Sequence, residues 1–176
     1  MVHAVTSAQR APAAQPSRTS VLFVCMGNIC RSPTAEAVFR EHAERAGLGH
    51  RLLIDSAGTG DWHVGEPPDH RAIVHARRRG YDLASLRARQ VRRDDFSRFA
   101  WILAMDIGNL RDLVALRPRD YPGHLGLLLD FVPDVGAREV PDPYFGGPEG
   151  FEAVLDLMER ASVALLARIR ATETAR

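Results

Sequence analysis

A chain of 176 residues is long enough for one ordinary α/β domain, and its 45% apolar and 26% charged residues are typical of a folded globular protein. The formal net charge of +1 gives no electrostatic reason to expect binding to nucleic acid or to a membrane surface. No run of 18 apolar residues is present that would span a membrane. All 23 basic residues are arginine, which favours a GC-rich bacterial gene and excludes Schiff-base chemistry on lysine.

The two cysteines, Cys25 and Cys30, lie five positions apart and leave nothing for a disulfide framework. We therefore expect a reducing compartment, the cytoplasm, while secretion into a host stays open. The histidines show no paired metal-ligand spacing, and soft ligands are too few for zinc, so we expect no metal and no cofactor. Residues 1–19 are rich in Ala, Pro, Ser and Gln and predict a disordered tail that lacks the apolar centre of a secretory signal.

The hydrophobic pattern predicts strands that alternate with helices along one domain over residues 20–171, followed by a short tail over 172–176. The expected strands cover residues 21–25, 52–57, 101–105 and 125–131, and the expected helices cover 33–46, 69–79, 107–116 and 148–171. This order predicts an α/β fold of three layers, with a four-stranded parallel sheet and helices on both faces. Ligands of such sheets bind beyond the carboxyl ends of the strands.

A short loop joins the first strand to the first helix and carries the most informative motif. Cys25 opens this loop and Arg31 closes it. Backbone N–H groups of so short a loop, together with the helix N-terminus and the arginine fork, form a cavity for a tetrahedral oxyanion. The same positive field stabilises a cysteine thiolate, which is then a nucleophile directed at phosphorus. The expected phosphate-binding residues are Met26, Gly27, Asn28, Ile29, Cys30 and Arg31. The structural alternative is a buried cysteine at an ordinary turn.

Five motifs give the chain a family resemblance. They are the Cys25–Pro33 loop, Asp61-Trp62, Ala88-Arg89-Gln90, Met105-Asp106 and Asp142-Pro143-Tyr144. On these residues the chain resembles the low-molecular-weight protein tyrosine phosphatases, of the bacterial type, from about residue 20 to about residue 169. The resemblance implies hydrolysis of phosphotyrosine and other aryl phosphates through a phosphocysteine. It also implies a monomer without cofactor that acts on phosphotyrosine proteins, with a bacterial tyrosine kinase as a partner.

The resemblance implies roles for the polar residues of the site. Cys25 is the nucleophile, Arg31 binds the transferring phosphoryl group, and Asp142 protonates the leaving group and then activates water. Asp142 is also explained as a turn residue before a proline, and Asp130 and Asp134 are its nearby rivals.

Three further residues are expected to support the loop. Ser32 donates a hydrogen bond to the cysteine sulfur, although it is also a plausible helix cap. Asn28 supports a strained turn and is tied to Ser56. A histidine that many relatives use for the same support is replaced here by Leu86, which leaves that part of the loop's support in doubt.

Aromatic residues are implied as the walls of the substrate cleft. Trp62 and Tyr144 match the family positions, and Phe145 is expected to join them. Such walls form a deep slot that phosphotyrosine reaches across and phosphoserine does not. A core tryptophan is the alternative for Trp62, but the surrounding Gly, Pro and charged residues favour an exposed position.

The arginine clusters do not indicate a nucleic-acid site. Arg77–Arg79 lie at a polar helix end, and Arg87, Arg89, Arg92 and Arg93 have no interleaved aromatic residues. We expect a solvated face, with Arg89 partly internal.

Three other functions are compatible with parts of the same sequence pattern. A thioredoxin-coupled arsenate reductase of the same fold needs two further cysteines downstream, and residues 31–176 contain none. Protein arginine phosphatases usually carry threonine where this chain has Ile29. A non-catalytic oxyanion-binding module would need neither the thiol nor the matched aspartate. Cys30 is also expected to form a protective disulfide with an oxidised Cys25, and the alternative is that Cys30 fills a small apolar space.

Overall fold

The computed structural model describes residues 19–175 and contains one parallel sheet with the strand order β2-β1-β3-β4. The strands are β1 (Ser20–Cys25), β2 (Leu53–Gly58), β3 (Trp101–Ala104) and β4 (His124–Leu127). The predicted α/β fold with four parallel strands is therefore confirmed. Apart from residue 19, the predicted N-terminal tail lies outside the described residues.

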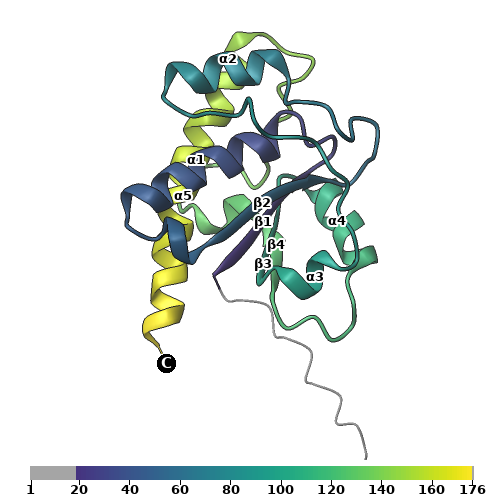
Figure 1. The fold of residues 1–176 in the computed structure, drawn as a ribbon, viewed down its shortest axis with the longest axis vertical. Helices are drawn as coiled ribbons and strands as arrows, with labels where there is room; N and C mark the ends of the chain where they lie inside the picture. The colour runs from purple at the N-terminus through teal and green to yellow at the C-terminus, as the bar shows by residue number, and fades with distance from the viewer. Residues whose placement is uncertain (1–18, 176) are drawn as a thin grey trace, which may run out of the picture.

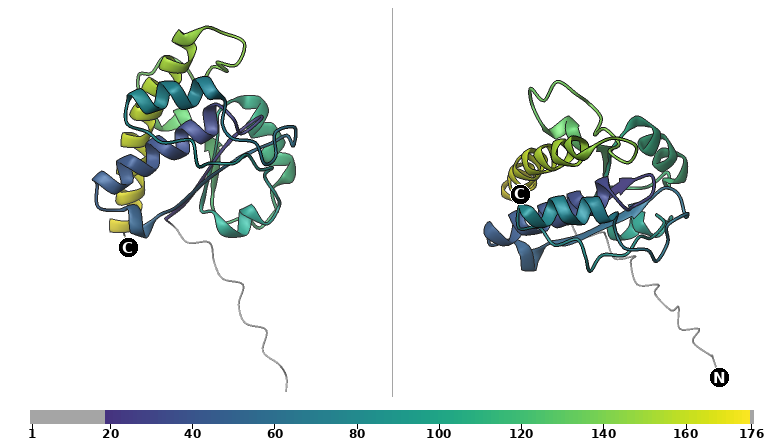
Figure 2. Two further views of the ribbon diagram at one scale, coloured as in Figure 1. Left: turned by 45° about the horizontal axis from the view of Figure 1, so that its top comes forward. Right: turned by 90° about the horizontal axis from the view of Figure 1, so that it is seen from above.

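Helices cover both faces of the sheet and complete the three predicted layers. They are α1 (Arg31–Arg45), α2 (His70–Arg78), α3 (Asp95–Arg98), α4 (Ile107–Leu116) and α5 (Pro148–Thr174), with short 3-10 helices η1 (Gly49–Arg51) and η2 (Leu128–Phe131). Figures 1 and 2 show α1 and α5 side by side on one face, whereas α3 and α4 lie on the other. Among the described residues, no helix is long and apolar enough to cross a membrane.

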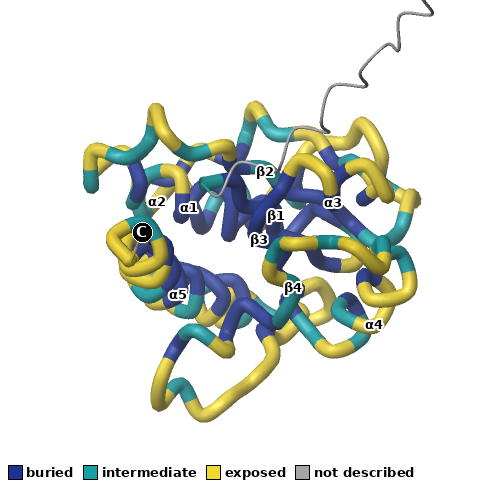
Figure 3. Tube along the Cα trace, turned by 90° about the horizontal axis from the view of Figure 1, so that it is seen from below, coloured by how far each residue is buried: buried dark blue, intermediate teal, exposed yellow. Residues whose placement is uncertain are grey.

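Strand β1 lies at the centre of the molecule and is buried on both faces (Figure 3). Phe23 and Cys25 point to the core beneath α1 and α5, while Leu22 and Val24 point to the core beneath α3 and α4. The uniformly apolar sequence of β1 follows from this double burial. Because the chain crosses over β1 between β2 and β3, the carboxyl end of β1 is the topological switch point of the sheet.

The predicted fourth strand is wrong over its second half. Pairing with β3 ends at Leu127, and the next four residues turn into η2, where Leu128 and Leu129 are buried. A continuous apolar run has the same periodicity signal in a buried strand and in a buried turn. The four-residue helix α3 had no sequence prediction, and α5 continues to Thr174 rather than ending near residue 171.

One of the arginines expected on a solvated face is only partly exposed. Arg79 caps the end of α2 and forms ion pairs with three acidic residues of α5, namely Glu152, Asp156 and Glu159. Arg77 and Arg78 are exposed, as predicted. Arg89 is partly buried between Asp55 and Asp95, in agreement with its expected internal position.

Candidate active site

The thiol of Cys25 lies at the carboxyl end of β1, where the phosphate loop (residues 26–31) begins. The residue is only 3% exposed. Its Sγ accepts a hydrogen bond from the Asn28 N–H at 3.3 Å and lies 3.0 Å from the Ser32 Oγ. Donors to sulfur stabilise the thiolate rather than the thiol. Within residues 19–175, the N–H groups of Gly27, Ile29 and Cys30 have no protein acceptor, so they are available to an oxyanion.

Asn28 holds the phosphate loop in its shape from the centre of a buried polar network. Its backbone has a φ of 56°, a left-handed conformation that asparagine tolerates better than most residues. Its side-chain amide donates to Ser32 Oγ at 2.8 Å and to Ser56 Oγ at 3.0 Å. The side-chain oxygen of Asn28, Oδ1, accepts a hydrogen bond from the Arg89 N–H at 3.0 Å. The structure thus brings together the three residues that were expected to support the loop.

Leu86, which stands in place of a histidine, leaves no unsatisfied polar side chain in this network. Leu86 is half-buried and packs against the core under α1 and α5. The Asn28 side-chain oxygen is bound by the main-chain N–H of Arg89. Among the described residues, no buried side-chain polar atom lacks a hydrogen-bond partner.

Glu36 extends the same network and was missed by the sequence reasoning. Its side chain is 5% exposed, accepts from Ser56 Oγ at 2.6 Å and pairs with Arg40 at 2.8 Å. Burial raises the pKa of Glu36, although the hydrogen bonds from Ser56 and Arg40 oppose that rise. The available signal was an acidic residue on the face of α1 that also carries the core residues Phe39 and Ala43.

Gly58 allows the phosphate loop to lie directly against the end of β2. A Cβ atom at this position would lie 2.6 Å from the Met26 carbonyl oxygen and 3.2 Å from the Asn28 nitrogen. Both neighbours are backbone atoms of the loop, so a larger residue would displace the loop itself.

Arg31 is the first residue of α1, and its guanidinium is buried beside the loop. One terminal nitrogen donates to Asp106 Oδ2 at 2.7 Å and to the Val140 carbonyl at 3.1 Å. The other nitrogen lies 3.5 Å from Asp142 Oδ2. Burial acts to lower the pKa of Arg31, but the negative charges of Cys25, Asp142 and Asp106 outweigh it and raise the pKa.

Asp106 is a second residue whose contribution the sequence reasoning did not assign. It follows β3, which neighbours β1, and its Oδ1 accepts from the Asn109 N–H at 2.7 Å as the N-cap of α4. The available signal was its place directly after a strand that neighbours the strand of Cys25. Its carboxylate is in position to orient Arg31.

Asp142 lies at the mouth of the site and its side chain is 47% exposed. Its Oδ1 accepts from the Tyr144 N–H at 3.1 Å, which fixes the turn around Pro143. The rival Asp130 pairs with Arg138, and the rival Asp134 is exposed in a left-handed turn. Neither rival lines the pocket that contains Cys25.

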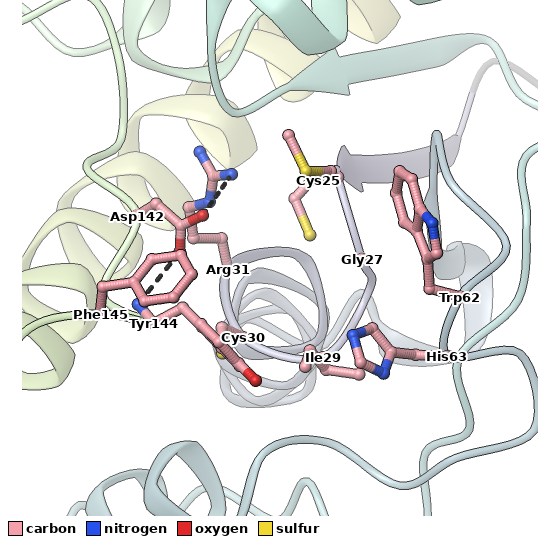
Figure 4. A pocket seen from close by; sticks show the side chains of 11 residues that line it. Cys25, Gly27, Ile29, Cys30, Arg31, Trp62, His63, Asp142, Tyr144 and Phe145 are labelled. Atoms are coloured by element: carbon pink, nitrogen blue, oxygen red, sulfur yellow. Dashed lines mark hydrogen bonds and ion pairs between the residues drawn. The ribbon is translucent and has the colours of Figure 1, made fainter.

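A pocket of about 210 Å³ has the Cys25 thiol at its floor (Figure 4). Tyr144 and Phe145 lie on the same side as Asp142, and Trp62 and His63 lie on the opposite side (Figure 4). Trp62 is 68% exposed and Phe145 95% exposed, so Trp62 is not a core residue. His63, whose Nδ1 pairs with Glu66 at 2.7 Å, is a lining residue that the sequence reasoning missed. The lining residues are Cys25, Met26, Gly27, Ile29, Cys30, Arg31, Trp62, His63, Asp142, Tyr144 and Phe145.

Cys30 lines the same pocket but has a different electrostatic environment. Both cysteines are free thiols. Burial, followed by the negative charges of Asp69 and Cys25, raises the pKa of Cys30 to about 12. The Cys30 thiol is therefore protonated at neutral pH. Within residues 19–175, no group of three His, Cys, Asp or Glu side chains is placed to hold a metal ion.

Together, the fold and this pocket define an α/β protein with a cysteine-containing phosphate loop at the carboxyl end of its central strand. The family model described as low molecular weight phosphotyrosine protein phosphatase matches residues 20–175. The chain belongs to this family, and the resemblance read from its motifs is confirmed.

Individual relatives agree with the family match. The chain is 49% identical over 153 residues to the low molecular weight protein-tyrosine-phosphatase of Streptomyces coelicolor, covering 85% of this chain and 93% of the relative. It is 44% identical over 151 residues to that of Bacillus subtilis, covering 86% and 96%. The crystal structure of the Bacillus subtilis protein matches with a TM-score of 0.82 at 40% identity, covering 92% and 99%. A crystal structure of the protein tyrosine phosphatase from Entamoeba histolytica matches with a TM-score of 0.84 at 38% identity, covering 88% and 99%.

Proposed function

We propose that the protein hydrolyses phosphotyrosine, and other aryl phosphate monoesters, through a phosphocysteine intermediate. The observation that carries the proposal is the pocket geometry. The Cys25 sulfur lies at its floor beside free backbone N–H groups and Arg31, and the Asp142 carboxyl lies at its mouth. Phosphate monoesters react so slowly without a catalyst that roughly 20 kcal/mol of barrier reduction is required.

In the first step, the Cys25 thiolate attacks phosphorus and the bond from phosphorus to the phenolic oxygen breaks. The phenolic oxygen keeps the electron pair of the broken bond and receives a proton from Asp142. In the second step, water gives a proton to Asp142 and attacks phosphorus, and the sulfur leaves as thiolate with inorganic phosphate as product. The equatorial oxygens carry the transition-state charge, which the loop N–H groups and the planar Arg31 fork stabilise.

The aromatic walls support a preference for aryl substrates. Trp62 and Tyr144 stand on opposite sides of the pocket, as Figure 4 shows, so a phosphorylated ring would lie between them. We expect the shorter side chain of phosphoserine to leave its phosphorus out of reach of Cys25. The natural partners would then be phosphotyrosine proteins in the cytoplasm, including a bacterial tyrosine kinase, and the enzyme would act as a monomer.

A redox role for Cys30 is part of the same proposal. Peroxide would convert the Cys25 thiolate to a sulfenic acid, and the Cys30 thiol would displace water from it to form a disulfide. The support is that both cysteines are free and line one pocket.

Matched phosphopeptides test the proposed substrate class directly. One peptide sequence is prepared with phosphotyrosine, phosphoserine or phosphoarginine at its centre, and phosphate release is measured with the wild-type enzyme and with Cys25→Ser. We expect release from phosphotyrosine alone, no turnover by Cys25→Ser, and unchanged activity in EDTA. Faster release from phosphoarginine would reassign the substrate, and full activity of Cys25→Ser would overturn the phosphocysteine route.

A further inference from the structure

The loop over residues 141–147, called here the acid loop, is exposed over most of its length. Contacts with the rest of the fold must therefore hold it in position relative to the phosphate loop. Among the described residues, the direct polar contact of Asp142 with the phosphate loop is the 3.5 Å approach to Arg31. The acid loop is attached at its start, where the Val140 N–H donates to the Met105 carbonyl at 2.8 Å. A general acid must come within hydrogen-bond reach of the leaving oxygen, about 2.6–3.2 Å.

Arg71, the second residue of α2, contacts the acid loop from the side. Its guanidinium carbon lies 5.4 Å from the centre of the Tyr144 ring and 4.8 Å from the centre of the Phe151 ring. A guanidinium within about 6 Å of an aromatic face is attracted to it. Tyr144 is joined to the catalytic end of the acid loop because its N–H donates to Asp142 Oδ1. Arg71 thus contacts the residue that holds the Asp142 carboxyl in its turn.

The guanidinium of Arg71 is also linked to the phosphate loop, through Asp69. Its Nε and one terminal nitrogen donate to the two carboxylate oxygens of Asp69 at 3.0 and 2.9 Å. The Asp69 N–H in turn donates to the Ile29 carbonyl at 2.8 Å. Contacts therefore run from Ile29 in the phosphate loop through Asp69 and Arg71 to Tyr144 in the acid loop.

We propose that Arg71 is a positioning residue that sets the place of Asp142 relative to the Cys25 phosphate loop. The inference rests on the proposed role of Asp142 as the general acid. Asp69 occupies the Nε edge of the Arg71 guanidinium in a two-pronged pair and balances its charge, which weakens Arg71 as a site for an acidic group of a substrate. Hydrogen bonds from Arg71 lower the pKa of Asp69, so the Asp69 carboxylate stays ionised to a lower pH than a free aspartate does.

The experiment compares aryl phosphates that differ in the leaving phenol. Arg71→Met keeps a long side chain and removes the ion pair and the stacked cation. The matched control is Arg78→Met, which makes the same change at an exposed arginine of the same helix. We expect kcat/KM of Arg71→Met to fall about tenfold for phenyl phosphate and less than about twofold for p-nitrophenyl phosphate, whose leaving group needs little protonation. Arg71→Lys should lie between wild type and Arg71→Met, inhibition by vanadate should be unchanged, and the control should match wild type.

Asp142→Ala separates the proposal from the function on which it rests. If Asp142→Ala loses equal activity on all substrates, Asp142 is not the acid and the proposed mechanism fails. If instead the loss of kcat/KM in Asp142→Ala grows with the basicity of the leaving phenol, Asp142 is the acid. The double variant Arg71→Met/Asp142→Ala should then have the same kcat/KM as Asp142→Ala alone. Additive losses, or a uniform loss with Arg71→Met on every substrate, would mean that Arg71 acts on the fold or on the phosphate loop and not on the acid.

Discussion

Two carboxylates face the guanidinium of Arg31, and their surroundings give them different tasks. Asp106 is fixed by a short ion pair and by the N-terminus of α4, whereas Asp142 is half-exposed and touches Arg31 loosely. A fixed carboxylate is suited to hold an arginine in one orientation. An accessible carboxylate that is not held in a short ion pair is suited to exchange protons with a leaving group or with water.

We therefore expect Asp106→Asn to lower kcat on the order of tenfold, and to do so equally for p-nitrophenyl phosphate and phosphotyrosine, because a misplaced Arg31 weakens every transition state. Steady-state kinetics on the two substrates checks this. Asp142→Ala is the contrast, since its loss should be larger with phosphotyrosine. An Asp106→Asn variant that discriminates between the two leaving groups would contradict an orienting role.

Cys30 should decide whether oxidative inactivation is reversible. We expect peroxide to inactivate the wild-type enzyme and dithiothreitol to restore it, while Cys30→Ser turns over normally but recovers much less. Since the pKa of Cys30 is raised to about 12, disulfide formation should be slow at neutral pH and faster in mild alkali. Activity assays after timed peroxide treatment at two pH values test both points. Bound phosphate should slow inactivation, and equal recovery of the two proteins would remove Cys30 from the scheme.

At the scale of elements, the Glu36 carboxyl couples α1 to β2 through Ser56 and makes stability depend on pH. Because its folded-state pKa is raised above the usual 4.5, the folded protein binds more protons than the unfolded chain from about pH 4.5 up to the raised value. Glu36 therefore contributes a loss of stability as pH rises through that window.

Glu36→Gln should remove this contribution. We expect the melting temperature of the variant to fall less than that of wild type between about pH 4.5 and pH 7, whatever the offset between the two curves. Thermal unfolding at a series of pH values measures the two slopes. Arg45→Gln, which changes an exposed ion pair on the same helix, is the control and should keep the wild-type slope. Parallel curves for wild type and Glu36→Gln would show that Glu36 does not titrate in this range.

The elements that were predicted well are those whose sequence has one interpretation. The strand ending at Cys25 is short and wholly apolar, and α1 begins with Pro33 in its first turn. The segment after Leu127 could not be assigned because Leu128 and Leu129 are buried in either conformation. For the site, Cys25 and Arg31 follow from local spacing, and Asp142 came from the family resemblance. Local pattern marks Asp106 and Glu36 as notable residues, but their roles depend on contacts with distant segments, and local pattern does not identify those partners.

At the scale of the molecule, an anion bound in the phosphate loop should stabilise the whole fold, since the loop joins β1 to α1 and contacts the end of β2. Phosphate at about 100 times its Kd should add about 2.7 kcal/mol. That corresponds to a rise of about 5–10 °C in the melting temperature of a chain of this size. Thermal unfolding with and without phosphate should show the rise in wild type and in Cys25→Ser, and lose it in Arg31→Met. The exposed Arg138→Met serves as control and should respond like wild type.

The two halves of the pocket come from distant parts of the chain, since Arg31 and Asp142 are 111 positions apart. The phosphate loop lies between β1 and α1 and against β2, which are near the start of the sequence, whereas the acid loop directly precedes the last helix, α5. Contacts of such long sequence separation carry a large loop-closure cost during folding, and exposed loops with few buried contacts open most readily in the folded state. Local opening of the exposed acid loop alone would leave the phosphate loop intact and remove the proton donor, so a molecule in that state would capture its substrate without consuming it.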